Sequence, residues 1–263
     1  MPLCVVLPVY HEQETLPTTL AELAAKVTRP HRVLVVYDRP DDPTVPVARA
    51  LQATYPNLEL IENQLGPGVL NAIRTGFQHA CPSDVESGAD AAVVVVMADL
   101  SDDLAQVEPM YRRLVDEGYD VVAGSRYSPG GAQHGGGLLK TSLSRLAGRS
   151  LAALTTIPTR DVTNAFKMYR ASFLRQVEIE SQGGFELSME LTIKAWAYGF
   201  RVSEVPSVWR DRAAGESKFK LAAWLPKYLG WYVAALGHHY LGRPIGSGVR
   251  ADRRAGGSPR DSD

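Results

Sequence analysis

The sequence predicts an α/β fold in which a mostly parallel central sheet is flanked by helices. Three observations support this prediction. Short runs of β-branched residues alternate with segments of helical periodicity through the first half of the chain, which is the pattern of a parallel sheet covered on both faces. The length of 263 residues suits one large α/β domain. Hydrophobic residues make up 45% and charged residues 22% of the chain, as in an ordinary globular protein with a sizeable core.

The predicted elements follow this alternation. In the first half, strands are expected at Cys4–Val9, Arg32–Val36, Leu58–Ile61, Ala92–Met97 and Asp120–Ala123. The helices between them are expected at Glu14–Lys26, Thr44–Thr54, Val69–Ala80 and Leu104–Glu117. The second half predicts a glycine-rich loop from Gly130 to Gly137, a helix at Leu139–Leu154, a strand at Asn164–Tyr169, a helix at Phe185–Tyr198, a strand at Arg201–Val208 and a long apolar, aromatic helix from Phe219. The tail from Gly242 to Asp263 is rich in Gly, Arg, Asp and Ser, which predicts disorder.

Composition and charge exclude several classes of function. The net charge of −1 argues against a dedicated nucleic-acid binder. Cys4 and Cys81 have no partner at the spacing of a metal site or a disulfide framework, so we expect both to be reduced and structural. No basic region precedes the first strand, which is therefore not a secretory signal. No apolar stretch reaches about 18 residues, so no membrane span is predicted and a cytoplasmic location is expected.

Polar side chains follow the first two strands, at the edge where ligands bind in open α/β sheets. Pro8, Tyr10 and Glu12 end the first strand, where a ring could stack on a nucleobase and a carboxylate could accept a hydrogen bond from it. Asp38 follows the second strand and could accept from a base or a ribose. The competing interpretation is a strand end followed by helix-terminal acids and an acidic, helix-capping turn.

The fourth strand leads into Asp99. A carboxylate at the end of a buried strand is well placed to hold a divalent cation against a diphosphate, because Mg²⁺ usually takes one or two protein carboxylates plus phosphate oxygens and water. Ser101 is interpreted as a helix cap, with Asp102 and Asp103 as acids of the first turn. That interpretation does not account for Asp99, which is the candidate metal ligand.

Two separated cationic loops indicate anion binding. The first carries Arg126 after the fifth strand, with Lys140 and Ser144 farther along, and the second carries Arg212 and Lys218. Guanidinium and ammonium groups suit phosphate oxygens. A solvated basic face would explain either loop alone, but two such loops in a chain of near-neutral charge favour phosphate binding.

Taken in order, these residues resemble the family 2 glycosyltransferases, and most closely the polyprenyl-phosphate glycosyltransferases typified by dolichol-phosphate mannose synthase. The resemblance runs from Leu3 to about Tyr232. The motifs that carry it are Pro8 to Glu12, Asp38 to Thr44, Met97 to Leu100, Gly124 to Tyr127, Asp161 to Arg170, Glu190 after Phe185, and the Arg-x-x-Gly-x-Ser-Lys segment of Arg212, Gly215, Ser217 and Lys218. That last segment is the most specific single signal.

The chain departs from the family pattern at two positions. Met97 stands where the metal motif has its first carboxylate, and a thioether is a poor ligand for a hard cation. Asp99 would then hold the metal with phosphates and water. Tyr37 stands where the family often has an aspartate after the second strand, which leaves base selectivity open.

The resemblance implies a GT-A type nucleotide-sugar-binding fold and an activity. A hexose, mannose or glucose, would move with inversion from a nucleoside-diphosphate sugar such as GDP-mannose to a polyprenyl or dolichyl phosphate. Mg²⁺ or Mn²⁺ at Asp99 would meet the diphosphate together with Arg212 and Lys218. The implied acceptor-phosphate residues are Arg126, Lys140 and Ser144. The residues implied to orient sugar hydroxyls or neighbouring cations are Asp161 and Glu190.

The predicted boundaries separate three parts. Residues 1–218 form the glycosyltransferase domain, residues 219–241 an aromatic-rich helix, and residues 242–263 a disordered tail. The aromatics and Lys227 between Leu221 and Tyr232 suit a helix that lies among lipid headgroups at the cytoplasmic face of a membrane. A packing helix or an oligomer interface is the competing interpretation.

Three other functions compete with lipid glycosylation. The acceptor could be a soluble hydroxyl compound, for which Asp161 or Glu190 would serve as base. The chain could also be a catalytically weakened nucleotide-sugar binder, because of Met97. A nucleotide- or flavin-binding doubly wound domain ranks last, since no Gly-x-Gly-x-x-Gly follows the first strand.

Overall fold

The computed structural model describes residues 1–81, 90–211 and 221–247, and for residues 221–223 it describes the backbone alone. The strands of its main sheet are β1 (Leu3–Val9), β2 (His31–Tyr37), β3 (Leu58–Glu62), β4 (Ala92–Val95), β5 (Val121–Ser125), β7 (Lys167–Arg170) and β8 (Val202–Pro206). Strands β6 (Ala132–His134) and β9 (Val208–Arg210) pair separately. The helices are α1 (Leu16–Lys26), α2 (Thr44–Leu51), α3 (Val69–Ala80), the 3₁₀ turn η1 (Leu104–Gln106), α4 (Val107–Val115), α5 (Leu138–Leu154), α6 (Ala171–Gln176), α7 (Glu186–Ala197) and α8 (Leu221–Leu241).

The predicted α/β fold is confirmed. The main sheet has the order β3-β2-β1-β4-β7-β5-β8, and its strands are parallel except for β7, which is antiparallel to β4 and β5. After β5 the chain leaves the main sheet and forms β6 and α5. It then returns to the sheet as β7, which starts at the carboxyl edge between β4 and β5. Lys167, the first residue of β7, therefore lies level with Val95 of β4 and Ala123 of β5.

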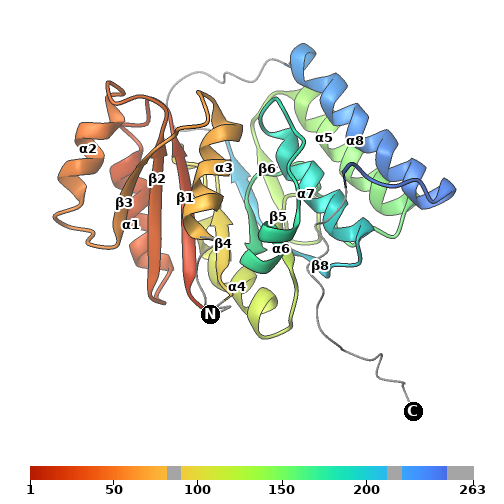
Figure 1. The fold of residues 1–263 in the computed structure, drawn as a ribbon, viewed down its shortest axis with the longest axis horizontal. Coiled ribbons are helices and arrows are strands. Elements are labelled where there is room, and N and C mark those ends of the chain that lie inside the picture. Colours follow the sequence, from red (N-terminus) through yellow and green to blue (C-terminus); the bar gives the residue numbers. More distant parts are fainter. Residues whose placement is uncertain (82–89, 212–220, 248–263) are drawn as a thin grey trace.

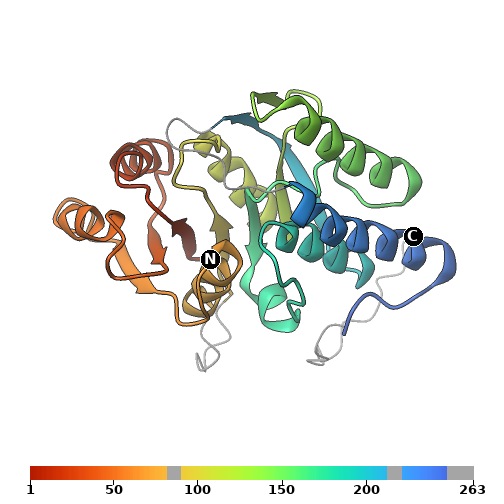
Figure 2. The same cartoon turned by 90° about the horizontal axis from the view of Figure 1, so that it is seen from above.

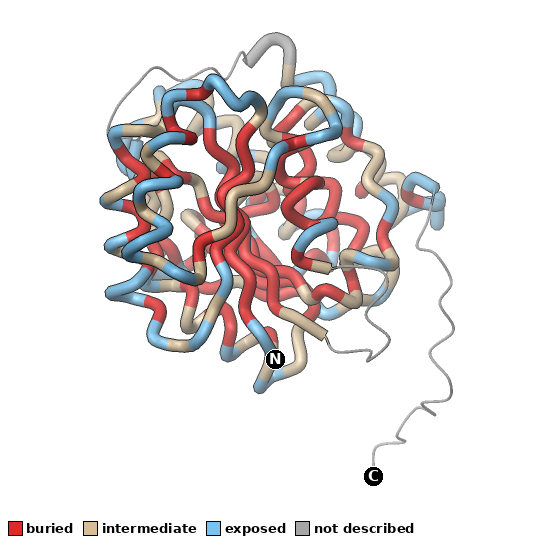
Figure 3. Tube along the Cα trace, turned by 60° about the vertical axis from the view of Figure 1, so that its left-hand side comes forward, coloured by how far each residue is buried: buried red, intermediate tan, exposed pale blue. Residues whose placement is uncertain are grey.

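Helices cover both faces of the sheet, as Figure 1 and Figure 2 show. One apolar cluster lies under α1, α2 and α4, a second under α3, α6 and α7, and a third joins α5, α7 and α8. Every residue of β1 and β4 is buried, so the middle of the sheet is the most buried part of the chain (Figure 3). Such continuous apolar strands are typical of a parallel sheet with two covered faces.

The second half holds the main differences from the predicted elements. The glycine-rich loop from Gly130 to Gly137 contains β6, which pairs with β9, and α6 directly follows β7. Residues 242–247, the first part of the predicted tail, lie against the domain. Ile245 is buried, and its carbonyl accepts a hydrogen bond from the Tyr198 hydroxyl. One apolar residue among polar neighbours is a weak sequence signal, yet it holds this segment against α7. Residues 248–263 lie outside the described residues.

Close packing of α3 on β1 makes a testable prediction at Gly76. A Cβ added there would lie 2.3 Å from Val6 Cγ1. We expect Gly76→Ala to lower the free energy of unfolding by about 1–3 kcal/mol, because overpacking a dense core forces side chains and backbone to shift. Urea unfolding followed by circular dichroism measures the change.

Gly230→Ala in α8 is the matched control, because a Cβ there meets no described atom within 4 Å. We expect it to be neutral or to stabilise the chain by up to about 1 kcal/mol, the helix propensity gained. Equal destabilisation by both substitutions would contradict the packing of α3 on β1.

Candidate active site

The carboxyl ends of β1, β2, β4 and β5 meet at one edge of the sheet. Two non-glycine residues with positive φ lie at this edge among the described residues, His11 after β1 (59°) and Leu100 after β4 (63°). Left-handed backbone at non-glycine residues costs free energy and often marks a functional site. The edge is therefore the first place to look for a ligand site.

The end of β1 is tied to the start of α2. The His11 amide donates to Asp42 Oδ2 at 3.1 Å, and the Glu12 amide donates to Thr44 Oγ1 at 2.8 Å. The Tyr10 ring is half exposed and stacks on the His11 ring, with centroids 4.4 Å apart. An exposed ring held in this way offers a face on which a planar base could stack.

Asp38 connects the ends of β2 and β3. Its Oδ1 accepts from Asn63 Nδ2 and its Oδ2 accepts from the Gly68 amide, both at 2.8 Å. Gly68 has a φ of 120° and precedes α3, so this carboxylate holds the turn that begins the helix. Pro8, predicted beside the nucleotide, is buried within β1.

Two carboxylates lie in the turn after β4, and both are partly buried. Asp99 Oδ1 accepts from the Ser101 amide at 3.1 Å. Asp102 turns back toward the strand, and its Oδ2 accepts from the Met97 amide at 2.9 Å. Burial raises the pKa of Asp102 to about 7; the Met97 amide opposes this shift, and the charge of Asp99 adds to it. The two carboxylates are thus close enough to repel each other.

The helix-cap interpretation holds only for Asp103. Its Oδ1 accepts from the Ala105 amide at 3.3 Å, so Asp103 and not Ser101 is the cap of η1. The prediction that Asp102 is an acid of the first helical turn is wrong, because its carboxylate accepts from the Met97 amide after β4 instead. Asp102 is therefore a further candidate site residue, which sequence reasoning missed. Its position three residues after Asp99 was the available signal.

The donor set after β4 fits a hard divalent cation. Carboxylate oxygens suit Mg²⁺ or Mn²⁺, which often bind one or two protein carboxylates and complete their coordination with phosphate oxygens and water. In the part of the chain that the structure describes, no three His, Cys, Asp or Glu side chains gather as a metal site. A cation at Asp99 would therefore depend on phosphate oxygens from a ligand.

A buried ion pair organises the edge beside β5. Arg126 Nε lies 2.7 Å from Asp161 Oδ2, and Arg126 Nη2 lies 2.8 Å from Asp161 Oδ1, so the pair is bidentate. The Asp161 side chain is fully buried and that of Arg126 is 10% exposed. Arg126 Nη2 also donates to Ser144 Oγ at 3.0 Å and to Thr163 Oγ1 at 2.9 Å. The Tyr127 hydroxyl donates to Ser144 Oγ at 2.9 Å.

This network brings together three residues that the sequence placed apart. Arg126 comes from the end of β5, Ser144 from α5 and Asp161 from the loop before β7. Burial alone would raise the pKa of Asp161, but the charge and hydrogen bonds of Arg126 hold it below its usual value. Lys140 lies one turn before Ser144 on the same side of α5 and is partly buried.

Glu190 is fully buried and its oxygens are occupied. They accept from the amides of Glu180 at 2.7 Å and Ser181 at 2.9 Å, and Lys194 Nζ lies 2.9 Å away. Of the two roles expected for Glu190, this geometry favours orientation of a neighbouring cation over contact with a sugar. The residue anchors the loop that precedes α7.

The start of α8 lies against that same loop. Glu186 accepts from the amides of Gly183 at 2.6 Å and Gly184 at 2.7 Å. A Cβ added to either glycine would lie within 2.6 Å of the Trp224 ring, so the glycine pair lets this ring lie directly on the loop. A Cβ added to Gly184 would also lie 3.3 Å from Val69 Cγ1, at the start of α3. The start of α8 therefore lies near α3 as well as near the loop before α7.

The second cationic loop falls outside the described residues. Arg212 and Lys218 belong to residues 212–220, so their predicted roles at the diphosphate stay predictions. In the described part of the chain, no helix is both long enough and apolar enough to cross a bilayer.

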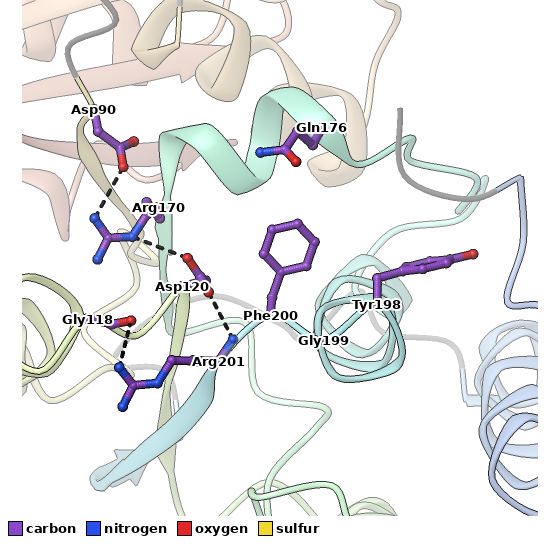
Figure 4. Close-up of a pocket in the computed structure, with 9 residues that line it drawn as sticks. All are labelled: Asp90, Gly118, Asp120, Arg170, Gln176, Tyr198, Gly199, Phe200 and Arg201. Atoms are coloured by element: carbon purple, nitrogen blue, oxygen red, sulfur yellow. Dashed lines mark hydrogen bonds and ion pairs between the residues drawn. The ribbon is translucent and has the colours of Figure 1, made fainter. Parts of the chain in front are cut away.

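A separate recess of about 600 Å³ lies at the opposite end of the sheet. Figure 4 shows Arg170 between Asp90 and Asp120, with nitrogen–oxygen distances of 3.2 and 3.3 Å. The Arg201 guanidinium donates to the Glu117 and Gly118 carbonyls. Both guanidinium groups therefore have partners within the protein. The recess also lies at the amino ends of the parallel strands, so it is not the candidate site.

Comparisons with known proteins identify the family of the chain. The family described as glycosyl transferase family 2 matches residues 4–178. Polyprenol monophosphomannose synthase of Mycolicibacterium smegmatis is 28% identical over 84% of this chain and 85% of its own length. Undecaprenyl-phosphate mannosyltransferase of Micrococcus luteus is 27% identical over 81% of this chain and 85% of its own length.

Solved structures support the fold. Glucosyl-3-phosphoglycerate synthase from Mycobacterium tuberculosis, in complex with phosphoglyceric acid, superposes with a TM-score of 0.64 at 18% identity, over 90% of this chain and 80% of that one. The same synthase with Mn²⁺, UDP-glucose and phosphoglyceric acid gives 0.63 at 17% identity, with the same coverage. The fold is thus of the GT-A type, and the chain belongs to glycosyl transferase family 2.

Proposed function

We propose that this chain transfers a hexose, mannose or glucose, from a nucleoside-diphosphate sugar to a polyprenyl phosphate, with inversion at the anomeric carbon. The observation that carries the proposal is the Arg126–Ser144 contact at the carboxyl edge, which places a guanidinium and a hydroxyl beside a helix with an apolar outer face. The names of the two curated relatives, a polyprenol monophosphomannose synthase and an undecaprenyl-phosphate mannosyltransferase, support the same acceptor and favour mannose.

Helices α5 and α8 form a surface that suits a bilayer. They lie side by side (Figure 2) and pack through Leu151 and Ala235. Neither helix contains an aspartate or a glutamate, although the chain has 29. Apolar side chains stand exposed on both, among them Leu138, Leu139, Leu146, Leu225, Leu229 and Val233. An acid-free apolar face with lysine and arginine at its margin is typical of helices that lie in anionic headgroups.

The chemistry needs little help from a general base. A phosphate monoester is already anionic near neutral pH, so its oxygen attacks the anomeric carbon as the nucleoside diphosphate leaves from the opposite side. Positioning and charge stabilisation then supply most of the rate enhancement. We assign acceptor positioning to Arg126, Lys140 and Ser144, and base stacking to Tyr10. A divalent cation held at Asp99 would neutralise charge on the leaving diphosphate.

Two other activities stay as alternatives. A soluble acceptor is favoured by the structural similarity to glucosyl-3-phosphoglycerate synthase in complex with phosphoglyceric acid. A nucleotide-sugar binder without turnover is favoured by Met97 in place of a carboxylate. Sugar transfer that requires a prenyl phosphate excludes both.

Asp99 provides the first functional test. We expect Asp99→Asn to lower the rate of hexose transfer to undecaprenyl phosphate by about 100-fold with Mg²⁺ or Mn²⁺, because charge stabilisation of the leaving group is lost. The assay uses radiolabelled GDP-mannose and UDP-glucose as donors. Calorimetry of Mn²⁺ binding in the presence of nucleoside diphosphate should show the same loss.

Glu22→Gln on the exposed face of α1 is the matched control, since it also removes one carboxylate. We expect it to leave both readings unchanged. Full activity of Asp99→Asn would remove this residue from the site, and transfer to phosphoglyceric acid but not to the prenyl phosphate would establish the soluble acceptor.

The apolar face of α8 provides the second test. Leu229 and Val233 are 56% and 57% exposed. We expect the double substitution Leu229→Glu and Val233→Glu to reduce recovery with phosphatidylglycerol-containing liposomes in flotation by about tenfold or more. Two apolar side chains that would enter the bilayer are lost, and the two new carboxylates are repelled by the anionic lipid.

Ala50→Glu with Ala53→Glu, two exposed positions in and just after α2, makes the same change in net charge away from this face. That variant should float like the wild type. Equal flotation of both variants would argue against membrane docking through α8.

A further inference from the structure

Strand β9 links the proposed acceptor side of the site to the proposed donor side. Just before the strand, the Ser207 amide donates to the Ser125 carbonyl at the end of β5, at 2.9 Å. At the end of the strand, the Arg210 amide donates to the Ser101 carbonyl in the turn after β4, at 3.0 Å. Strand β7 separates β4 from β5 in the main sheet. Strand β9 therefore joins two strand ends that do not pair with each other.

Asp211 follows β9 and extends this link to the start of α5. Its amide donates to the His134 carbonyl of β6 at 2.9 Å, and its Oδ2 accepts from the Gly136 amide at 3.0 Å. A hydrogen bond from a backbone amide to an ionised carboxylate is stronger than one between neutral groups. Gly136 lies two residues before α5, the helix that carries Lys140 and Ser144. Asp211 therefore holds the N-terminal end of that helix.

Glycines allow the loop before α5 to approach Asp211. Gly135, Gly136 and Gly137 have positive φ values of 85°, 86° and 72°, a conformation that glycine adopts at little cost. A Cβ added to Gly135 would lie 2.8 Å from the Asp211 Cβ, whereas one added to Gly137 would meet no described atom within 4 Å. Gly135 is therefore the point at which the loop backbone packs on Asp211.

The same loop is bonded to the proposed acceptor residues. Gln133 Nε2 donates to Thr141 Oγ1 in the first turn of α5, at 2.9 Å. The Tyr127 hydroxyl lies 2.9 Å from both Gln133 Oε1 and Ser144 Oγ, and Ser144 in turn accepts from Arg126. A shift of the loop away from β9 would therefore move the acceptor residues as well.

We propose that Asp211 is a positioning residue that sets the separation between the acceptor side and the donor side of the site. The inference rests on the proposed function. Transfer requires the acceptor oxygen to lie about 3–3.5 Å from the anomeric carbon, and a misplacement of about 1 Å can cost about 100-fold in rate. Asp211 holds the helix of Lys140 and Ser144 against the strand that is bonded to the turn of Asp99. Loss of its carboxylate should impair alignment of the two substrates, not the binding of either one.

Asp211→Ala in the purified chain tests this assignment. We expect kcat for transfer from the active donor, GDP-mannose or UDP-glucose, to undecaprenyl phosphate to fall by about 10–100-fold. The Kd of nucleoside diphosphate with Mn²⁺ and the Kd of farnesyl phosphate, each measured by calorimetry, should change by less than about threefold. Hydrolysis of the donor by water needs no aligned acceptor, so the ratio of transferred to released sugar should fall.

Asp211→Asn separates positioning from charge. Its side-chain oxygen still accepts from the Gly136 amide, so we expect it to keep about a third or more of the wild-type kcat. A general base or a metal ligand at this position would lose its activity in both substitutions. Asp116→Ala, an exposed aspartate at the C-terminal end of α4, is the matched control and should behave as the wild type.

Two glycine substitutions test the same contact from the loop. Gly135→Ala and Gly137→Ala both place a methyl group at a positive φ, so both strain the backbone, but only the first brings the methyl group against Asp211. We expect Gly135→Ala to lower kcat by about tenfold or more with both Kd values retained. Gly137→Ala should keep kcat within about threefold of the wild type, because it adds strain alone.

The outcomes separate this inference from the function beneath it. Wild-type kcat in Asp211→Ala, equal loss in Asp211→Ala and Asp211→Asn, or equal loss in the two glycine variants would overturn the role of Asp211 and leave lipid glycosylation intact. The glycine pair decides alone if Asp211→Ala fails to fold. Binding of nucleoside diphosphate without transfer to undecaprenyl phosphate by the wild type would overturn the proposed acceptor, and the inference with it.

Discussion

The ion pair between Arg126 and Asp161 is the interaction on which the proposed acceptor side of the site depends. It joins the end of β5 to the loop before β7, and through Ser144 it reaches α5. A buried carboxylate without its partner costs about 3–5 kcal/mol. The ion pair therefore stabilises the loop of residues 161–164 beside β5 and keeps the Arg126 guanidinium at this edge of the sheet.

The loops on the proposed donor side are held by hydrogen bonds to backbone amides, not by an ion pair. There, carboxylates and hydroxyls bind backbone amides of the neighbouring loop: Asp42 and Thr44 fix the end of β1, and Asp38 fixes the turn before α3. The donor edge thus presents the Tyr10 ring and the carboxylates of Asp99 and Asp102, a surface suited to a planar base and to a cation with its phosphates.

Local sequence patterns predicted what depends on local structure. Buried strands and amphipathic helices leave periodic signals, so β1 to β5 and their helices were found to within a few residues. Pairing is not local. The antiparallel insertion of β7 and the β6–β9 ladder depend on where the chain returns, which periodicity does not record. The same limit hid the contact of Asp102 with the Met97 amide, because the sequence neighbours of Asp102 suggest a helix cap.

Helix α5 carries both the proposed phosphate-binding residues and an exposed apolar face. Gly148 permits the approach: a Cβ there would lie 2.0 Å from the Arg160 carbonyl oxygen. Ser144, one turn earlier on the same side, is thereby brought to Arg126, while Leu139 and Leu146 are displaced around the helix and stay exposed. The two sides of a helix are only about 10 Å apart. A prenyl phosphate therefore needs no channel through the protein: its headgroup and its hydrocarbon chain would meet opposite sides of the same helix.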